Sequence, residues 1–175
     1  MKARSSVIRK LVYQSDFTKP DGWDERHSSR VKAFRCGGYY HIAVYNGAYG
    51  AWSGPLDVVD SFKAQLDVEL NFQSGKTAEC GMVFCAEEAC DTYFFFAFTV
   101  RPDGVYRLCR VLNTKATFII DWKSSEMINK GLATNSLSIE KKRMHSDTGD
   151  KRTNRRKDRR RRTQTRSCGH VCLLI

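Results

Sequence analysis

The sequence has no long apolar run and no long helical repeat. None of its segments reaches the roughly 18 consecutive apolar residues that identify a membrane-spanning helix. Residues 1–17 carry charges and lack the continuous apolar stretch of a signal peptide. No segment before residue 140 repeats its apolar residues with the helical period of about 3.6 residues. We therefore expect a cytoplasmic protein, as the chain is written, with few helices.

Motifs for common enzyme chemistry are also missing. The chain contains no G-x-S-x-G, no glycine-rich phosphate loop, no H-E-x-x-H and no D-x-D-x-D calcium loop. Its seven cysteines include no C-x-x-C pair, and its four histidines are scattered. Cys80, Cys85 and Cys90 recur every five residues, but a structural zinc site usually adds a second ligand pair elsewhere in the chain, and the scattered histidines do not supply one. We expect no metal site and no cofactor, and the odd cysteine count without an export signal favours free thiols.

Charge is unevenly divided along the chain. The whole chain has 30 Lys+Arg and 19 Asp+Glu, a net charge of +11. Residues 141–175 hold 13 basic and 3 acidic residues, whereas residues 1–140 hold 17 basic and 16 acidic residues. The body is nearly neutral and offers no electrostatic basis for binding a polyanion. Only the C-terminal segment has the positive charge that such binding requires.

Residues 64–72 show the clearest strand pattern. Leu66, Val68, Leu70 and Phe72 alternate with polar residues, as in a strand with one buried face. The polar positions of this strand are Gln65, Asp67, Glu69 and Asn71.

Further strand candidates are separated by turn residues. CGMVFC and TYFFFAFTV are apolar on both faces, which is typical of central strands. Residues 101–104, RPDG, predict a hairpin between TYFFFAFTV and VYRLCRVL. Residues 124–135 predict a loop, and the other strand candidates are YYHIAVY, YGAWS, ATFIIDW and NSLSIE. The pattern predicts an all-β sandwich.

The order of these segments carries a family resemblance. An acidic-aromatic element, DF…GW, stands at Asp16, Phe17, Gly22 and Trp23. YYHIAV, AWS, the alternating strand, GMVF, the Asp-Gly turn, a Y-R-φ strand and an I-x-x-G…N-x-L-x-φ segment follow. Over residues 12–142 the chain thereby resembles bacterial concanavalin A-like lectin/glucanase domains (LamG-like). The resemblance implies an antiparallel jelly-roll β-sandwich, with carbohydrate-binding domains and sugar-processing enzymes among its relatives.

The pattern breaks after Lys142. Domains of this type continue there with a strand of the LTFYVNG kind, whereas this chain continues with a basic segment without strand-like alternation. The predicted organisation is an N-terminal extension (1–11), a truncated jelly-roll sandwich (12–142) and a basic tail (143–175) that is expected to be disordered. Missing strands would leave unpaired sheet edges and favour self-association.

Three interpretations of the basic tail stay open. In the first, which the abrupt break favours, a frameshift or recombined reading frame replaced the natural end, and the tail has no selected role. In the second, the tail is an electrostatic arm that binds nucleic acid or an anionic membrane. In the third, the ending CLLI is a prenylation box behind a polybasic stretch, with Cys172 as the lipidated residue.

Asp67 and Glu69 are the candidates for a catalytic pair. They lie two residues apart on one face of the predicted strand, with Cα atoms about 6.6–6.8 Å apart. Inverting glycosidases place two carboxyl groups about 6.5–9.5 Å apart, so the spacing is compatible with a glycoside-processing enzyme. The glucanases of the superfamily that this chain resembles carry E-x-D-x-x-E on such a strand. Here the order is reversed and the third position is Phe72, so a solvated or ligand-facing polar row is the simpler interpretation.

Carbohydrate binding is the favoured function. Sugar rings stack on aromatic side chains, while carboxylates, amides and arginines bond the hydroxyl groups. We expect a non-catalytic carbohydrate-binding or general recognition module, with a glycoside-processing enzyme or a tail-driven membrane or nucleic-acid binder as alternatives. For the tryptophans, which lie inside strand-like patterns, packing in the core is the simpler role. The candidate ligand-binding residues are Tyr45, Tyr49, Trp52, Asp67, Glu69, Asn71, Tyr106 and Arg110.

Overall fold

The computed structural model describes residues 10–45, 52–54, 61–70, 77–89, 92–142 and 171–174. The chain forms two units, Met1–Tyr49 and Gly50–Ile175. Every regular element among the described residues is a β-strand, and all strand pairs are antiparallel. The prediction of an all-β protein with antiparallel sheets is therefore confirmed. The jelly-roll strand order and the boundaries at residues 11 and 142 stay predictions.

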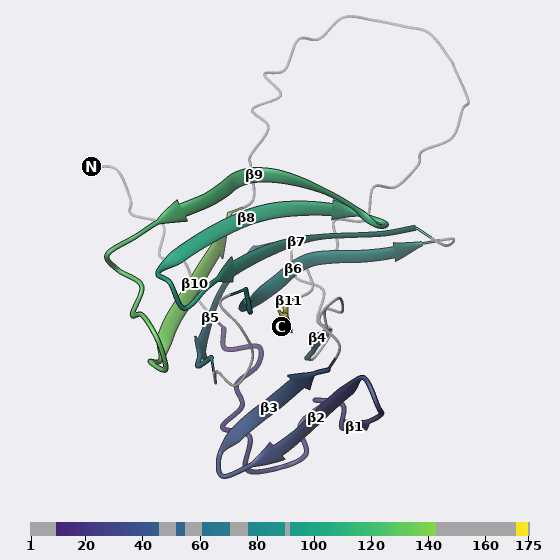
Figure 1. Ribbon diagram of the computed structural model, residues 1–175. Helices are drawn as coiled ribbons and strands as arrows, with labels where there is room; N and C mark the ends of the chain where they lie inside the picture. The colour runs from purple at the N-terminus through teal and green to yellow at the C-terminus, as the bar shows by residue number, and fades with distance from the viewer. Residues whose placement is uncertain are drawn as a thin grey trace, which may run out of the picture. The chain divides into compact units, whose positions relative to one another are not determined.

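The first unit contains a three-stranded sheet. Its strands are β1 (Arg26–His27), β2 (Val31–Cys36) and β3 (Tyr39–Val44), in that order (Figure 1). Gly37 and Gly38 join β2 to β3 with φ values of 60° and 78°. Two consecutive positive φ angles are typical of the two-residue hairpin turn that follows the natural twist of strands, and glycine adopts them without steric cost.

An aromatic cluster packs inside this unit. The buried Trp23 ring lies 4.8 Å from the Tyr40 ring and 5.1 Å from the Phe17 ring, centroid to centroid, the latter edge to face. The Trp23 indole Nε1–H donates to the Tyr13 hydroxyl group, so the polar atom of this buried ring is satisfied. The DF…GW element thus supplies packing residues.

The second unit contains a six-stranded sheet. The strand order across it is β4-β11-β6-β7-β8-β9, and the neighbouring strands can be followed in Figure 1. The strands are β4 (Trp52–Ser53), β6 (Cys80–Ala89), β7 (Thr92–Val100), β8 (Val105–Leu112), β9 (Lys115–Ser124) and β11 (Val171–Leu174).

The predicted hairpin between β7 and β8 is present. Val100 pairs with Tyr106, and the Arg101 backbone N–H donates to the Val105 carbonyl group at 2.9 Å. Gly104 closes the turn with a φ of 88° and donates its N–H to the Arg101 carbonyl group at 3.1 Å. The Asp-Gly pair therefore forms the turn that its residue types predict.

Both faces of the six-stranded sheet bury apolar side chains. Val83, Ala97 and Cys109 form a cluster on one face, and Met82 on the other face is almost fully buried. Gly81 precedes Met82 in β6, and a Cβ atom added to it would stand 1.9 Å from the Phe98 carbonyl oxygen. The small residue at position 81 therefore lets β6 and β7 approach one another.

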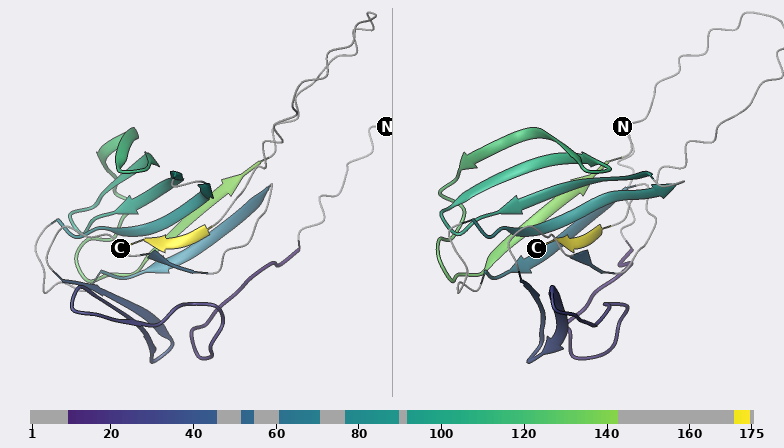
Figure 2. Two further views of the ribbon diagram at one scale, coloured as in Figure 1. Left: turned by 90° about the vertical axis from the view of Figure 1, so that its right-hand side faces the viewer. Right: turned by 45° about the vertical axis from the view of Figure 1, so that its right-hand side comes forward.

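A separate two-stranded sheet is formed by β5 (Phe62–Val68) and β10 (Asn135–Lys141). Figure 2 shows it alongside the six-stranded sheet of the same unit. Val68, Leu70 and Leu137 are buried, whereas Asp67 and Glu69 are exposed. The predicted alternation of residues 64–70 is confirmed, and Asn71 and Phe72 lie outside the described residues.

The end of the chain differs from the prediction. Strand-like alternation was not expected after Lys142, yet β11 pairs with β6 on one side and with β4 on the other. Its sequence, VCLL, is a short apolar run that can enter a sheet, but four residues are too few to give a recognisable period next to a long basic segment. Residues 143–170 lie outside the described residues, and the expected disorder there stays a prediction.

Candidate functional site

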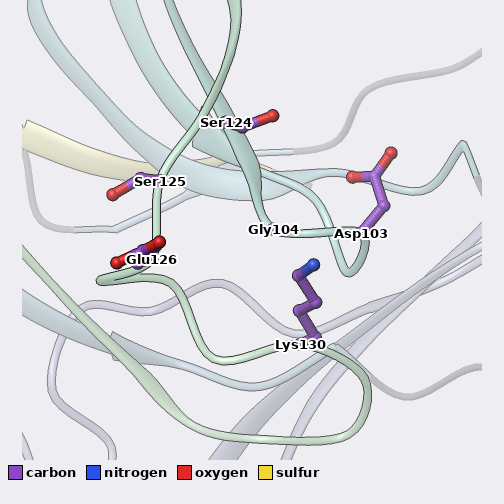
Figure 3. A pocket seen from close by; sticks show the side chains of 6 residues that line it. All are labelled: Asp103, Gly104, Ser124, Ser125, Glu126 and Lys130. Carbon is purple, nitrogen blue, oxygen red and sulfur yellow. The ribbon is translucent and has the colours of Figure 1, made fainter.

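A polar pocket of about 310 Å³ lies at one end of the β7–β8 hairpin. Its walls come from the β7–β8 turn, from the end of β9 and from the loop that leads toward β10 (Figure 3). The lining residues are Asp103, Gly104, Ser124, Ser125, Glu126 and Lys130.

Backbone hydrogen bonds hold the turn and the loop together. The Ser125 N–H donates to the Gly104 carbonyl group, and the Gly131 N–H donates to the Pro102 carbonyl group, both at 3.0 Å. At the far end of the loop, the Asn135 side chain accepts from the Asn129 N–H at 2.8 Å and donates to the Asn129 carbonyl group at 3.0 Å. Main-chain bonds therefore fix the turn against the loop, and the Asn135 side chain fixes the far end of the loop.

Lys130 lies across the β7–β8 turn. A Cβ atom on Gly104 would come within 2.7 Å of the Lys130 Cε atom, so the lysine stem occupies the space that the glycine leaves open. Figure 3 shows the ammonium group pointing toward the turn and the Asp103 carboxylate extending away from it. Among the described residues, no carboxylate lies within ion-pair distance of Lys130.

The lining supplies hydrogen-bond donors and acceptors. Asp103 and Glu126 offer carboxylate oxygens, Lys130 offers an ammonium group, and the two serines offer hydroxyl groups. None of the six lining residues is a histidine or a cysteine, so they include no serine–histidine or cysteine–histidine pair. This arrangement suits the binding of a polar ligand better than nucleophilic catalysis.

Asp67 lies elsewhere, on the exposed face of the β5–β10 pair, and Glu69, which follows the end of β5, is also exposed. Asp67 is opposite Ser136 in the strand register, and the Ser136 hydroxyl group donates to the Asp67 carboxylate. Neither carboxylate belongs to the pocket lining. Their solvent-facing position agrees with a polar row on the outside of a sheet.

Tyr106 and Arg110 share one face of β8. The Tyr106 ring is partly buried and packs edge to face on Phe98, with centroids 6.1 Å apart. Arg110 is exposed, two strand positions beyond Leu108. Neither residue lines the pocket, and the contact with Phe98 gives Tyr106 a packing role.

The other candidate residues are spread over the chain. Tyr45 follows β3 in the first unit and is exposed. Trp52 and Cys172 are placed in β4 and β11, but their side chains lie outside what the structure describes, as do Tyr49 and Asn71 entirely. Among the described candidates, none lines the pocket.

The cysteines agree with the expected free thiols where the structure describes them. Cys36, Cys80, Cys85 and Cys109 are all free. Burial raises the pKa of Cys80 to about 12, and burial also raises the pKa of Cys109. Within the described part of the chain, no cluster of His, Cys, Asp and Glu side chains could hold a metal ion.

The residues of the pocket were present in the sequence as a turn and a loop. RPDG predicted the turn, and residues 124–135 predicted the loop, but neither pattern showed that the two segments meet. The pairing of β8 with β9 brings Ser124 opposite Val105 and so places the loop beside the turn. The sequence did contain one signal for the pocket. Polar residues follow β9 directly, and β9 itself pairs with the second strand of the predicted hairpin.

Comparison with known proteins gave no match to a protein-family model, to a curated protein or to a solved structure. The structure alone supports a coarse class, an all-β protein with antiparallel sheets that is compatible with a β-sandwich. None of the described residues belongs to a helix with the length and apolar character that a membrane crossing requires.

Proposed function

We propose that this chain is a non-catalytic, lectin-like recognition module that binds a carbohydrate in the pocket at the β7–β8 turn. The observation that carries the proposal is the pocket itself, whose five side chains all bear a polar or charged group. Sugar hydroxyl groups donate to carboxylates and accept from ammonium groups, so Glu126 and Lys130 suit neighbouring hydroxyls on one ring. The resemblance to concanavalin A-like domains points to the same class of ligand.

The availability of the charged groups supports this proposal. Lys130, Asp103 and Glu126 take part in no ion pair among the described residues. A pocket of about 310 Å³ lies at the small end of the usual range for ligand sites, which agrees with a ligand of one or two sugar rings.

A glycan array followed by titration calorimetry tests the proposal. We expect a glycan from the array to bind the unaltered chain, and Glu126→Gln and Lys130→Met each to weaken it at least about tenfold, since each removes a charge-assisted hydrogen bond. Lys130→Met keeps an unbranched stem over Gly104 and so preserves the packing there. The matched controls, Lys63→Met in β5 and Glu69→Gln just after it, remove the same charges from exposed positions and should leave the affinity unchanged.

The same variants separate the proposal from its enzyme alternative. If Glu69→Gln weakens binding and the pocket variants do not, the ligand site lies on β5 and the pocket proposal is wrong. If the chain hydrolyses a glycoside, converting Asp67 and Glu69 together to amides should abolish the reaction, and an unchanged rate removes that pair from consideration. A blank array with folded protein argues against carbohydrate binding altogether.

A further inference from the structure

Two arginines lie over one tryptophan ring of the six-stranded sheet. The Cζ atoms of Arg101 and Arg107 stand 4.2 Å and 4.5 Å from the centroid of the Trp122 ring. Arg101 directly follows β7, Arg107 belongs to β8 and Trp122 to β9, so three neighbouring segments of the sheet build this cluster. Cations at such distances from an indole ring are attracted by its electron-rich face.

The charges of the two arginines are not equally compensated. Arg107 forms an ion pair with Glu79, whose second carboxylate oxygen accepts from the Thr99 hydroxyl group at 2.7 Å. Arg101 has no carboxylate within ion-pair distance among the described residues, and its buried Nε atom has no hydrogen-bond acceptor there. Glu79 neutralises one of the two guanidinium groups, so within the described part of the chain the cluster keeps one positive charge.

An uncompensated guanidinium group in a partly buried position has a physical cost. Partial burial removes hydrogen bonds between the guanidinium group and water, and only an anion or a set of hydrogen-bond acceptors can replace them. The Arg101 Cζ atom lies 4.2 Å from the Trp122 ring centroid, and the Nε donor of the same guanidinium group is buried. The two Nη groups can still offer parallel N–H donors to the two oxygens of a carboxylate.

Arg101 begins the β7–β8 turn, which contributes to the pocket lining, and its carbonyl group accepts from the Gly104 N–H. It is followed by Pro102, Asp103 and Gly104, of which the last two line the pocket. Trp122, on which Arg101 rests, precedes the lining residue Ser124 by two positions on β9, a spacing of about 6.6–6.8 Å along a strand. We expect a substituent on a sugar ring held in the pocket to reach the guanidinium group.

We propose that Arg101 is an anion-binding residue for the ligand of this pocket, and that the ligand is an acidic sugar whose ring carries a carboxylate. The proposal rests on the proposed function, because it assigns the charged group of a carbohydrate that the pocket residues hold by its hydroxyls. Trp122 positions the arginine, and Arg107 with Glu79 supports the ring from the neighbouring strand.

Calorimetry with matched charged and neutral sugars tests this assignment. The probes are disaccharides ending in glucuronate or galacturonate, each compared with its methyl ester, which has the same ring and no charge. We expect the unaltered chain to bind an acid at least about tenfold more tightly than its ester. Arg101→Gln should lower the affinity for the acid to that for the ester and leave the ester unchanged. The control Lys115→Gln removes an exposed positive charge of β9 outside the pocket and should change neither affinity.

The outcomes separate this inference from the proposed function. Equal binding of acid and ester by the unaltered chain overturns the role of Arg101 and leaves carbohydrate binding in the pocket intact. Equal weakening of both probes by Arg101→Gln also overturns it, since the arginine would then act on the shape of the pocket. Binding of no sugar, charged or neutral, contradicts the proposed function itself. The comparison of acid with ester needs no variant, so the test stands if Arg101→Gln does not fold.

Discussion

Gly81 shows how a single residue limits the packing of the six-stranded sheet. Any side chain there would meet the Phe98 carbonyl oxygen of the neighbouring strand at 1.9 Å, and a backbone atom in a hydrogen-bonded sheet cannot move away easily. We expect Gly81→Ala to lower the free energy of unfolding by roughly 1–3 kcal/mol, measured by urea denaturation. Gly131→Ala is the contrasting variant, because it meets no atom within 4 Å but carries a φ of 74°. A loss of no more than about 1 kcal/mol at position 131, and more at 81, would attribute the larger effect to crowding.

The cysteines provide a second residue-scale prediction. Burial raises the pKa of Cys80 to about 12, so fewer than about one in a thousand of its thiols are ionised at pH 8.5. Since the thiolate is the reactive form, we expect iodoacetamide at that pH to modify the exposed Cys36 rapidly and to spare Cys80 and Cys109 until denaturant is added. Peptide mass mapping measures this directly. Rapid modification of Cys80 in the folded chain would contradict its burial in β6.

Among the elements, β11 should contribute the most stability per residue, because this four-residue strand pairs on both sides. It lies between β4 and β6, so its loss would leave the edge of β6 unpaired from Gly81 to Phe84. We expect Leu173→Pro, which removes a backbone N–H inside the strand, to lower the free energy of unfolding by roughly 2–4 kcal/mol. Leu173→Val keeps the N–H and the preference for strands and should cost less than about 1.5 kcal/mol. Equal effects of the two variants, by denaturant titration, would show that pairing of β11 contributes nothing.

The sequence patterns predicted some elements well, and others depended on information that no local pattern carries. The alternation of residues 64–70 and the Asp-Gly turn after β7 are local signals, and both elements formed as predicted. The register shift in β6 between Phe84 and Glu87, where Cys85 has a φ of 53°, follows from pairing with β7 and has no signature in β6 itself. The pocket likewise depends on bonds between residues 102–104 and a loop more than twenty positions later. The candidate ligand-binding residues were chosen largely for their aromatic rings, and they missed the pocket because the pocket lining contains no aromatic side chain.

For the whole molecule, the division of charge separates two kinds of binding. The pocket and the Arg101 cluster belong to a body that is nearly neutral, whereas residues 141–175 carry a net charge of +10. A small charged sugar recognised by one guanidinium group should therefore show a weak dependence on salt. Binding of a polyanion such as duplex DNA, if it occurs, should show a steep dependence, because each neutralised phosphate releases counterions.

Substituting Arg159, Arg160, Arg161 and Arg162 together by glutamine tests this separation. The change lowers the net charge from +11 to +7. We expect it to reduce the slope of log affinity for DNA against log salt by up to about 3.6, while binding of a uronate disaccharide stays unchanged. The control replaces four exposed lysines of the body, Lys32, Lys63, Lys115 and Lys123, and has the same net charge. If this control flattens the DNA slope equally, net charge rather than the basic segment governs DNA binding. If the arginine variant loses the sugar, the acidic ligand is bound by the basic segment and not by Arg101.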